Sequence, residues 1–238
     1  MKMYKKVMAA ALAGVMTVSM SATAFAADDD GYILKATNED SKSSDNDLVI
    51  AIEGSVSSMD PANIPDTNAI SATRGVYETL VSFDENQELT GKLAESWEVS
   101  DDSLTYTFKL RQGVKFQDGT DFNAAAVKAN YDRVVNKDNN LRQRRTFIVT
   151  NEDGSETPRV DSIETPDDYT LVIKLTQAWA PFINRLTQFC IISPAALEEY
   201  GNDIMNHPCG TGPYVCTEWE EGDHTSFKRN DDYWALTL

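Results

Sequence analysis

The stretch from Gly91 to Val135, GKLAESWEVSDDSLTYTFKLRQGVKFQDGTDFNAAAVKANYDRVV, decides the fold of this chain. Apolar and polar residues alternate strictly from Leu104 to Leu110, which is the period of a strand with one buried face. A short β-run around Trp97 precedes them, and Ser100-Asp101-Asp102-Ser103 has the composition of a turn. Together these features predict a β-hairpin.

A second turn and a helix complete the stretch. Gly113 interrupts the strand, and Asp118-Gly119 supplies a tight turn because glycine adopts positive φ without steric cost. Asn123 is the predicted N-cap of a helix, since its side chain can accept a hydrogen bond from an amide of the first turn. Four residues then recur at helical spacing on one face: Ala124, Val127, Tyr131 and Val134.

Further motifs follow in the C-terminal part. A second hairpin is predicted from Val160 to Leu175, because apolar residues alternate after the turn Pro166-Asp167-Asp168, at Tyr169, Leu171, Ile173 and Leu175. Beyond it lie the runs Gly210-Thr211-Gly212-Pro213-Tyr214 and Arg229-Asn230-Asp231-Asp232-Tyr233-Trp234. The first of these is no phosphate-binding loop, because it lacks a Gly-Lys-Ser/Thr ending and precedes a strand.

The order of these motifs resembles the signature of the extracytoplasmic solute-binding proteins of family 5. The motifs are, in chain order, L-A-E-S-W, T-Y-T-F-K-L-R-x-G-V-K-F-x-D-G, F-N-A, G-T-G-P-Y and N-D-D-Y-W. That family comprises the dipeptide-, oligopeptide- and nickel-binding components of ABC importers. The resemblance extends from Leu48 to Trp234. One departure stands at Ala126, where an acidic residue is common in the family.

The resemblance implies an α/β fold: the first lobe of a type II periplasmic binding protein, with a mixed sheet and β-hairpins. One subdomain would comprise about 48–75 plus 194–238, and an inserted subdomain about 76–193. Family members are about twice as long, and the match stops at Tyr233-Trp234. We therefore expect 48–238 to be the N-terminal part of the family's domain, with the second lobe missing.

The resemblance also implies a function. The protein would capture peptides outside the cytoplasmic membrane and deliver them to the permease subunits of an ABC importer, as a monomer without a cofactor. Ile64, Pro65, Asp66 and Thr67, which follow the family's Asp-Pro pair at Asp60-Pro61, fall where the family loop meets the solute. The same residues also suit an Asp-Pro turn without a ligand, and nickel or another small solute remains an alternative to peptide.

The N-terminus predicts export. Three lysines, an apolar run from Val7 to Val18 and Ala24-Phe25-Ala26 form a signal peptide over 1–26, cleaved before Ala27. The run is too short to span a membrane, and the absence of a cysteine before Cys190 argues against a lipoprotein. Residues 27–47 are polar and predict a disordered tether. Leu48-Val49-Ile50-Ala51-Ile52 then predicts a strand covered on both faces.

Composition limits the partners. The chain has 21 Lys and Arg against 38 Asp and Glu, a net charge of −17. Such a surface repels nucleic acid and anionic lipid, so we expect no nucleic-acid partner. With the export signal, this charge predicts a soluble protein of the periplasm or extracytoplasmic space.

Cysteines and catalytic motifs give weaker signals. Cys209 and Cys216 bracket the glycine-rich turn and can form a disulfide, although an extended exit from the turn would hold their Cα atoms too far apart. Neither His207 nor His224 has a partner at metal-binding spacing, so we expect no metal site. The sequence contains no G-x-S-x-G elbow, and no enzyme is predicted. A secreted enzyme and a surface interaction module remain the alternative classes.

Overall fold

The computed structural model describes residues 48–237. The predicted signal peptide (1–26) and tether (27–47) lie outside the described residues. The chain divides into two units between Ala51 and Ile52, and the fold below is that of the second unit.

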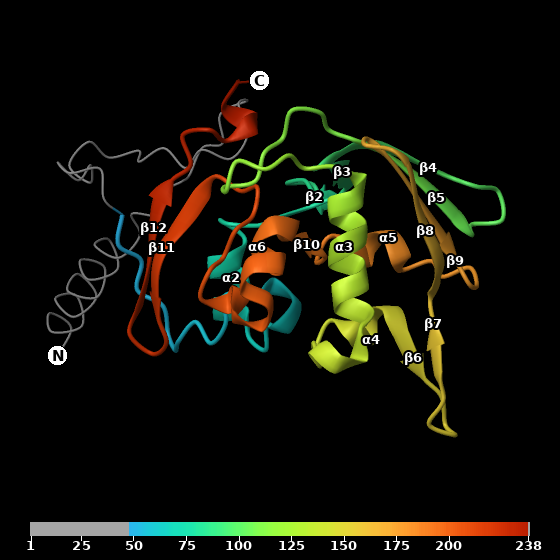
Figure 1. The fold of residues 1–238 in the computed structure, drawn as a ribbon, viewed down its shortest axis with the longest axis horizontal. Helices are drawn as coiled ribbons and strands as arrows, with labels where there is room; N and C mark the ends of the chain where they lie inside the picture. Colours follow the sequence, from blue (N-terminus) through green and yellow to red (C-terminus); the bar gives the residue numbers. More distant parts are fainter. Residues whose placement is uncertain (1–47, 238) are drawn as a thin grey trace, which may run out of the picture. The chain divides into compact units, whose positions relative to one another are not determined.

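A four-stranded antiparallel sheet is its largest element (Figure 1). The strand order is β4 (Ala94–Val99), β5 (Thr105–Leu110), β9 (Thr170–Leu175) and β8 (Val160–Asp167). Both predicted hairpins are present, β4–β5 and β8–β9. They join through β5 and β9, with Phe108 opposite Leu171. Tyr106, Phe108 and Leu110 are buried, which confirms the alternation predicted for this strand.

Helices and aromatic side chains cover the buried face of this sheet. Helix α3 (Ala124–Val135) begins at Asn123, whose side chain accepts the amide of Ala126 at 2.9 Å, as predicted. Helix α5 (Phe182–Leu186) places Phe182 against Tyr106, with ring centroids 4.8 Å apart. These contacts make one apolar core of β5, β9, α3 and α5.

Asn130 is a buried polar residue of α3 that the apolar pattern did not reveal. Its side chain bonds both backbone groups of Ile192: Nδ2 donates to the carbonyl at 2.8 Å, and Oδ1 accepts the amide at 3.0 Å. Asn130 therefore satisfies the backbone of Ile192 as a neighbouring strand would.

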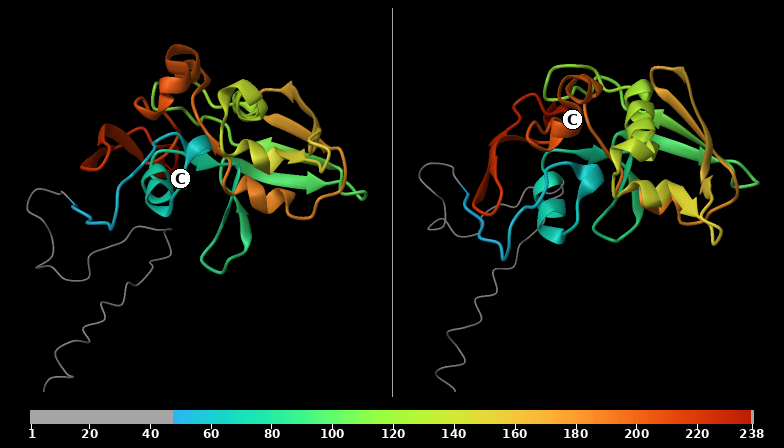
Figure 2. Two further views of the ribbon diagram at one scale, coloured as in Figure 1. Left: turned by 90° about the horizontal axis from the view of Figure 1, so that it is seen from below. Right: turned by 60° about the horizontal axis from the view of Figure 1, so that its bottom comes forward.

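The remaining elements are short. Their bounds, in chain order, are η2 (Pro61–Asn63), α2 (Thr67–Thr73), β1 (Glu78–Thr79), β2 (Val81–Phe83), β3 (Leu89–Gly91), η3 (Lys137–Asn139), α4 (Arg144–Phe147), β6 (Ile148–Thr150), β7 (Glu156–Pro158), β10 (Cys190–Ile191), α6 (Pro194–Tyr200), η4 (Gly201–Met205), β11 (Tyr214–Glu220), β12 (His224–Arg229) and η5 (Trp234–Thr237). The β11–β12 hairpin lies on the opposite side of this unit from the four-stranded sheet (Figure 2). No helix in the described part of the chain combines the length and apolar character needed to cross a bilayer.

The glycine-rich turn before β11 packs directly on the backbone at Gly75 and Val76. The amide of Gly212 donates to the Val76 carbonyl, and that of Tyr214 to the Gly75 carbonyl, both at 2.9 Å. A Cβ added at Gly210 would lie 2.2 Å from the carbonyl oxygen of Val76, and only glycine leaves room for that approach. This is where 48–75 and 194–238 would join, although the division into two subdomains stays a prediction.

The α/β class is confirmed, and every strand pair among the described residues is antiparallel. The prediction of a buried strand at Leu48–Ile52 is wrong for this structure. The segment forms no strand, and Leu48, Val49 and Ile50 are 82%, 92% and 72% exposed. A strand needs a hydrogen-bonded neighbour, and no strand in the described range pairs with this segment.

Candidate functional site

Two aspartates hold the predicted solute-facing loop, Ile64–Thr67. Before the loop, Asp60 caps η2: its carboxylate accepts the Ala62 amide and its carbonyl accepts the Asn63 amide, both at 3.0 Å. At its end, Asp66 is the N-cap of α2 and accepts the Ala69 amide at 2.9 Å. Because short caps fix both ends, the chain between them has little freedom.

Within this loop the four predicted residues differ in exposure. Ile64 and Asp66 are half-buried, whereas Pro65 and Thr67 are exposed. The hydroxyl of Ser57 donates a short hydrogen bond to Asp66. That bond, followed by the Ala69 amide, holds the pKa of Asp66 below its ordinary value. The Asp66 carboxylate is thus charged and committed to the fold, and Pro65 and Thr67 form the accessible part of the loop.

An ion pair joins the start of the loop to α3. Arg133 donates from Nη2 to Oδ2 of Asp60 at 2.7 Å and from Nη1 to Oδ1 at 3.2 Å. The two side chains are 10% and 8% exposed. A planar guanidinium that meets a carboxylate with both nitrogens fixes orientation as well as distance.

Two hollows lie elsewhere in the unit. A groove of about 280 Å³ runs between α3 and α6 and is lined by Ala129, Arg133, Asn139, Pro194, Leu197, Glu198, Gly201 and Asn202. A core void of about 10 Å³ has an entirely apolar lining. Neither hollow includes a residue of Ile64–Thr67.

Cys209 and Cys216, which the sequence left open as a possible disulfide, are both free thiols in this structure. The thiol of Cys209 hydrogen-bonds Asp118, and burial followed by that neighbouring carboxylate raises the pKa of Cys209 to about 12. The thiol of Cys216 donates to the carbonyl of Glu218 at 3.5 Å. The turn leads straight into the extended strand β11, and each of the two thiols hydrogen-bonds a different partner.

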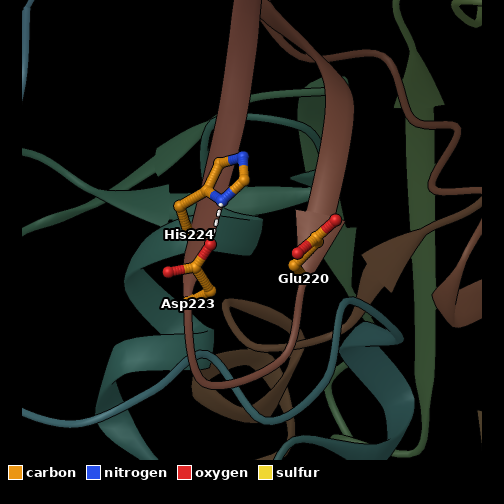
Figure 3. A group of neighbouring side chains, drawn as sticks. All are labelled: Glu220, Asp223 and His224. Carbon is orange, nitrogen blue, oxygen red and sulfur yellow. Dashed lines mark hydrogen bonds and ion pairs between the residues drawn. The ribbon is translucent and has the colours of Figure 1, made fainter.

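A cluster at the tip of the β11–β12 hairpin escaped the sequence analysis (Figure 3). Potential ligand atoms of Glu220, Asp223 and His224 lie within 4.8 Å of one another. His224 Nδ1 lies 2.9 Å from Asp223 Oδ2, and Nε2 lies 3.2 Å from Glu218 Oε2. The hairpin register, which places Glu220 opposite His224, is the signal that could have revealed the cluster.

Hydrogen bonding explains the closeness of these groups. Hydrogen bonds to Asp223 and then Glu218 raise the pKa of His224, which favours the protonated imidazole between the two carboxylates. Imidazole and carboxylate also suit divalent transition metals. All the side chains are exposed and the imidazole is already held at both nitrogens, and we therefore assign no metal to them.

Comparison with known proteins places this geometry in a family. The profile of "Bacterial extracellular solute-binding proteins, family 5 Middle" matches residues 88–237. The glutathione-binding protein GsiB of Salmonella typhi is 42% identical over 194 residues, covering 81% of this chain and 36% of the relative. GsiB of Escherichia coli O157:H7 is 38% identical over 227 residues, covering 94% of this chain and 39% of the relative.

Solved structures agree. The periplasmic binding protein DppA from Helicobacter pylori, in complex with the peptide STSA, is 31% identical with a TM-score of 0.61, covering 75% of this chain and 38% of that one. NikA from Brucella suis, in complex with Fe(III)-EDTA, is 34% identical with a TM-score of 0.61, covering 75% and 34%.

The expected fold, that of a periplasmic binding protein, is thereby confirmed. The chain spans little more than a third of the length of the GsiB relatives it matches. Over that span, the two hairpins and the capped helix are those that the residue pattern predicted. The chain belongs to the bacterial extracellular solute-binding proteins of family 5.

Proposed function

We propose that this chain contributes to the solute-capturing component of an ABC importer and that its solute is a short peptide. The observation that carries the proposal is its likeness to glutathione-binding proteins at 42% and 38% identity. Glutathione is itself a tripeptide, and the solved H. pylori neighbour holds the peptide STSA. On this proposal the protein acts outside the cytoplasm and has permease subunits as its partners. It catalyses no reaction.

The loop Ile64–Thr67 supplies one wall of the proposed site. Pro65 and the exposed part of the half-buried Ile64 offer apolar surface, and Thr67 offers a hydroxyl that can donate to or accept from a peptide group. The loop contains no lysine or arginine. Recognition of the ligand's carboxylates therefore has to come from residues outside it.

An open wall binds weakly. Small-molecule sites bury most of the ligand surface, whereas this loop lies outside both hollows. We expect the 238-residue chain alone to bind glutathione weakly or not at all. Thermal unfolding with excess glutathione measures this, since a site at a hundred times its Kd adds about 2.7 kcal/mol, or roughly 5–11 °C for this size. A shift that large would refute the single-wall account.

A chimera tests the function itself. The remainder of the S. typhi relative is placed after residue 238, and its affinities for glutathione and a plain tripeptide are measured by calorimetry. Peptide binding that falls at least tenfold in Ile64→Asp, but not in the control Ile70→Asp at an exposed position of α2, supports the proposal. A chimera that folds but binds neither peptide refutes it.

Nickel is the second candidate solute. It is favoured by the likeness to NikZ from Campylobacter jejuni, which was solved in complex with Ni(L-His), at 28% identity and a TM-score of 0.66. The same chimera titrated with Ni²⁺ and excess histidine separates the two solutes. A saturable heat of binding with nickel and none with glutathione would show that the solute is nickel and not a peptide.

A further inference from the structure

Asp60 makes more polar contacts than a turn residue needs. Its carboxylate accepts from the Ala62 amide and from both terminal nitrogens of Arg133. Its amide donates to Ser58 Oγ at 3.1 Å, and its carbonyl accepts from the Asn63 amide. Each hydrogen-bonding group of Asp60 is therefore engaged, and among residues 48–237 its side-chain hydrogen bonds to a distant element all come from Arg133.

Burial makes this contact a geometric constraint. With side-chain exposures of 8% and 10%, the carboxylate and the guanidinium are nearly dry. A buried ion pair is weak evidence for stability, because desolvation offsets much of the attraction. Separating the partners would leave an uncompensated buried charge, so the pair enforces one relative position of the loop and α3.

The rigid side of this contact is α3. The Arg133 carbonyl accepts from Asn139 Nδ2 at 2.8 Å, which closes the C-terminal end of the helix. The same helix buries Val127 and Val134 in the main core. A second contact reaches the loop from the segment after η3, where the Gln143 amide donates to the Ala62 carbonyl at 3.0 Å. The loop is thus positioned from α3 and its C-terminal continuation.

We propose that Arg133 is a positioning residue for solute capture: through Asp60 it sets the place of Ile64–Thr67, although the structure gives it no contact with those four residues. The inference rests on the proposed function only in what the loop binds. The placement of the loop itself can be measured without any solute.

Hydrogen exchange of the 238-residue chain tests the placement. In Arg133→Met we expect the Ala62 and Asn63 amides to exchange at least tenfold faster, while amides of β5 keep their rates. Arg133→Lys keeps the charge but loses the two-pronged geometry, so its effect should be intermediate. It also covers the case in which Arg133→Met does not fold.

The matched control is Lys128→Met. It removes a cation from the same helix, where Lys128 pairs with Asp132 at 2.5 Å on the exposed face. Its loop amides should exchange as in the wild type. Unchanged loop exchange in Arg133→Met and Arg133→Lys, or an equal rise in β5, would overturn the positioning role.

The chimera adds the solute. Peptide affinity should fall at least tenfold in Arg133→Met and remain within twofold in Lys128→Met. Faster loop exchange with unchanged affinity would overturn the inference and leave the peptide function standing. A chimera without peptide affinity would refute the proposed function, whereas the exchange experiment would still decide whether Arg133 places the loop.

Discussion

Replacing Glu78 with glutamine should destabilise the fold through one buried carboxylate. Oε1 of Glu78 accepts from the Tyr233 hydroxyl at 2.7 Å and lies 3.1 Å from the Lys92 ammonium. Oε2 accepts from Thr211 Oγ1 at 2.8 Å and from Trp234 Nε1 at 2.7 Å. Glu78 is 4% exposed. A single carboxylate therefore ties β1 to the glycine-rich turn and to the Tyr-Trp motif.

A glutamine of the same shape cannot reproduce these contacts. If its NH₂ group replaces Oε2, it faces the Trp234 indole, which can only donate. If it replaces Oε1, it faces the Lys92 ammonium, also only a donor, although the Tyr233 hydroxyl can turn to accept. The second orientation should prevail, because Lys92 is 37% exposed and can move into water. Losing the charge at several hydrogen bonds should cost about 2–4 kcal/mol.

Urea denaturation measures this cost. With a slope of about 2–3 kcal/mol per molar, the midpoint should fall by roughly 0.7–2 M in Glu78→Gln. Glu95→Gln makes the same chemical change at an exposed position and should move the midpoint by less than about 0.3 M. Equal midpoints for wild type and Glu78→Gln would show that the carboxylate is not required by its donors.

Three further predictions follow from the same structure. Phe108→Ala, at a residue with no exposed surface, should cost about 3–5 kcal/mol in urea, whereas Thr107→Ala on the opposite face should cost under about 1; equal effects would contradict the strand assignment. Gly212→Ala places a Cβ 2.5 Å from the Gly75 carbonyl oxygen and should cost about 1–3 kcal/mol or more, whereas Gly75→Ala meets only ordinary contacts and serves as the control. NMR titration should place the midpoint of His224 above 6.5, because the carboxylate that precedes it and then Glu218 raise its pKa. The stabilisation of the fold by these contacts is complete below pH 6.5 and is lost as pH rises through the folded pKa. A midpoint at or below 6.5 would exclude this contribution.

Local sequence patterns predicted the fold wherever both partners of an interaction lie close together in the sequence. Leu104–Leu110 alternates, and the strand it pairs with lies just before it across a four-residue turn. Asn123 was recognised as a cap because its acceptor and the Ala126 amide are three residues apart. In such cases the sequence contains both partners of the interaction within a few residues.

The candidate site was less accessible to sequence reasoning because its contacts are distant along the chain. Asp60 and Arg133 are 73 residues apart, and Glu78 and Tyr233 are 155 apart. Charged residues are usually solvated, and no local pattern distinguishes these two carboxylates from the other acidic residues. The loop Ile64–Thr67 was proposed from a family resemblance, and its anchoring by Asp60 and Arg133 became visible only in three dimensions.

The contrast between Leu104–Leu110 and Leu48–Ile52 separates two kinds of apolar pattern. Alternation requires cover on one face only, and α3 and α5 provide that cover for β5. A continuous apolar run requires cover on both faces and a hydrogen-bonded neighbour, and it does not state which segment provides them. Here the run is exposed, in a chain that matches little more than a third of its relatives' length. The same reasoning applies to the solute-facing loop, because its own residues determine its shape but enclosure depends on what packs opposite.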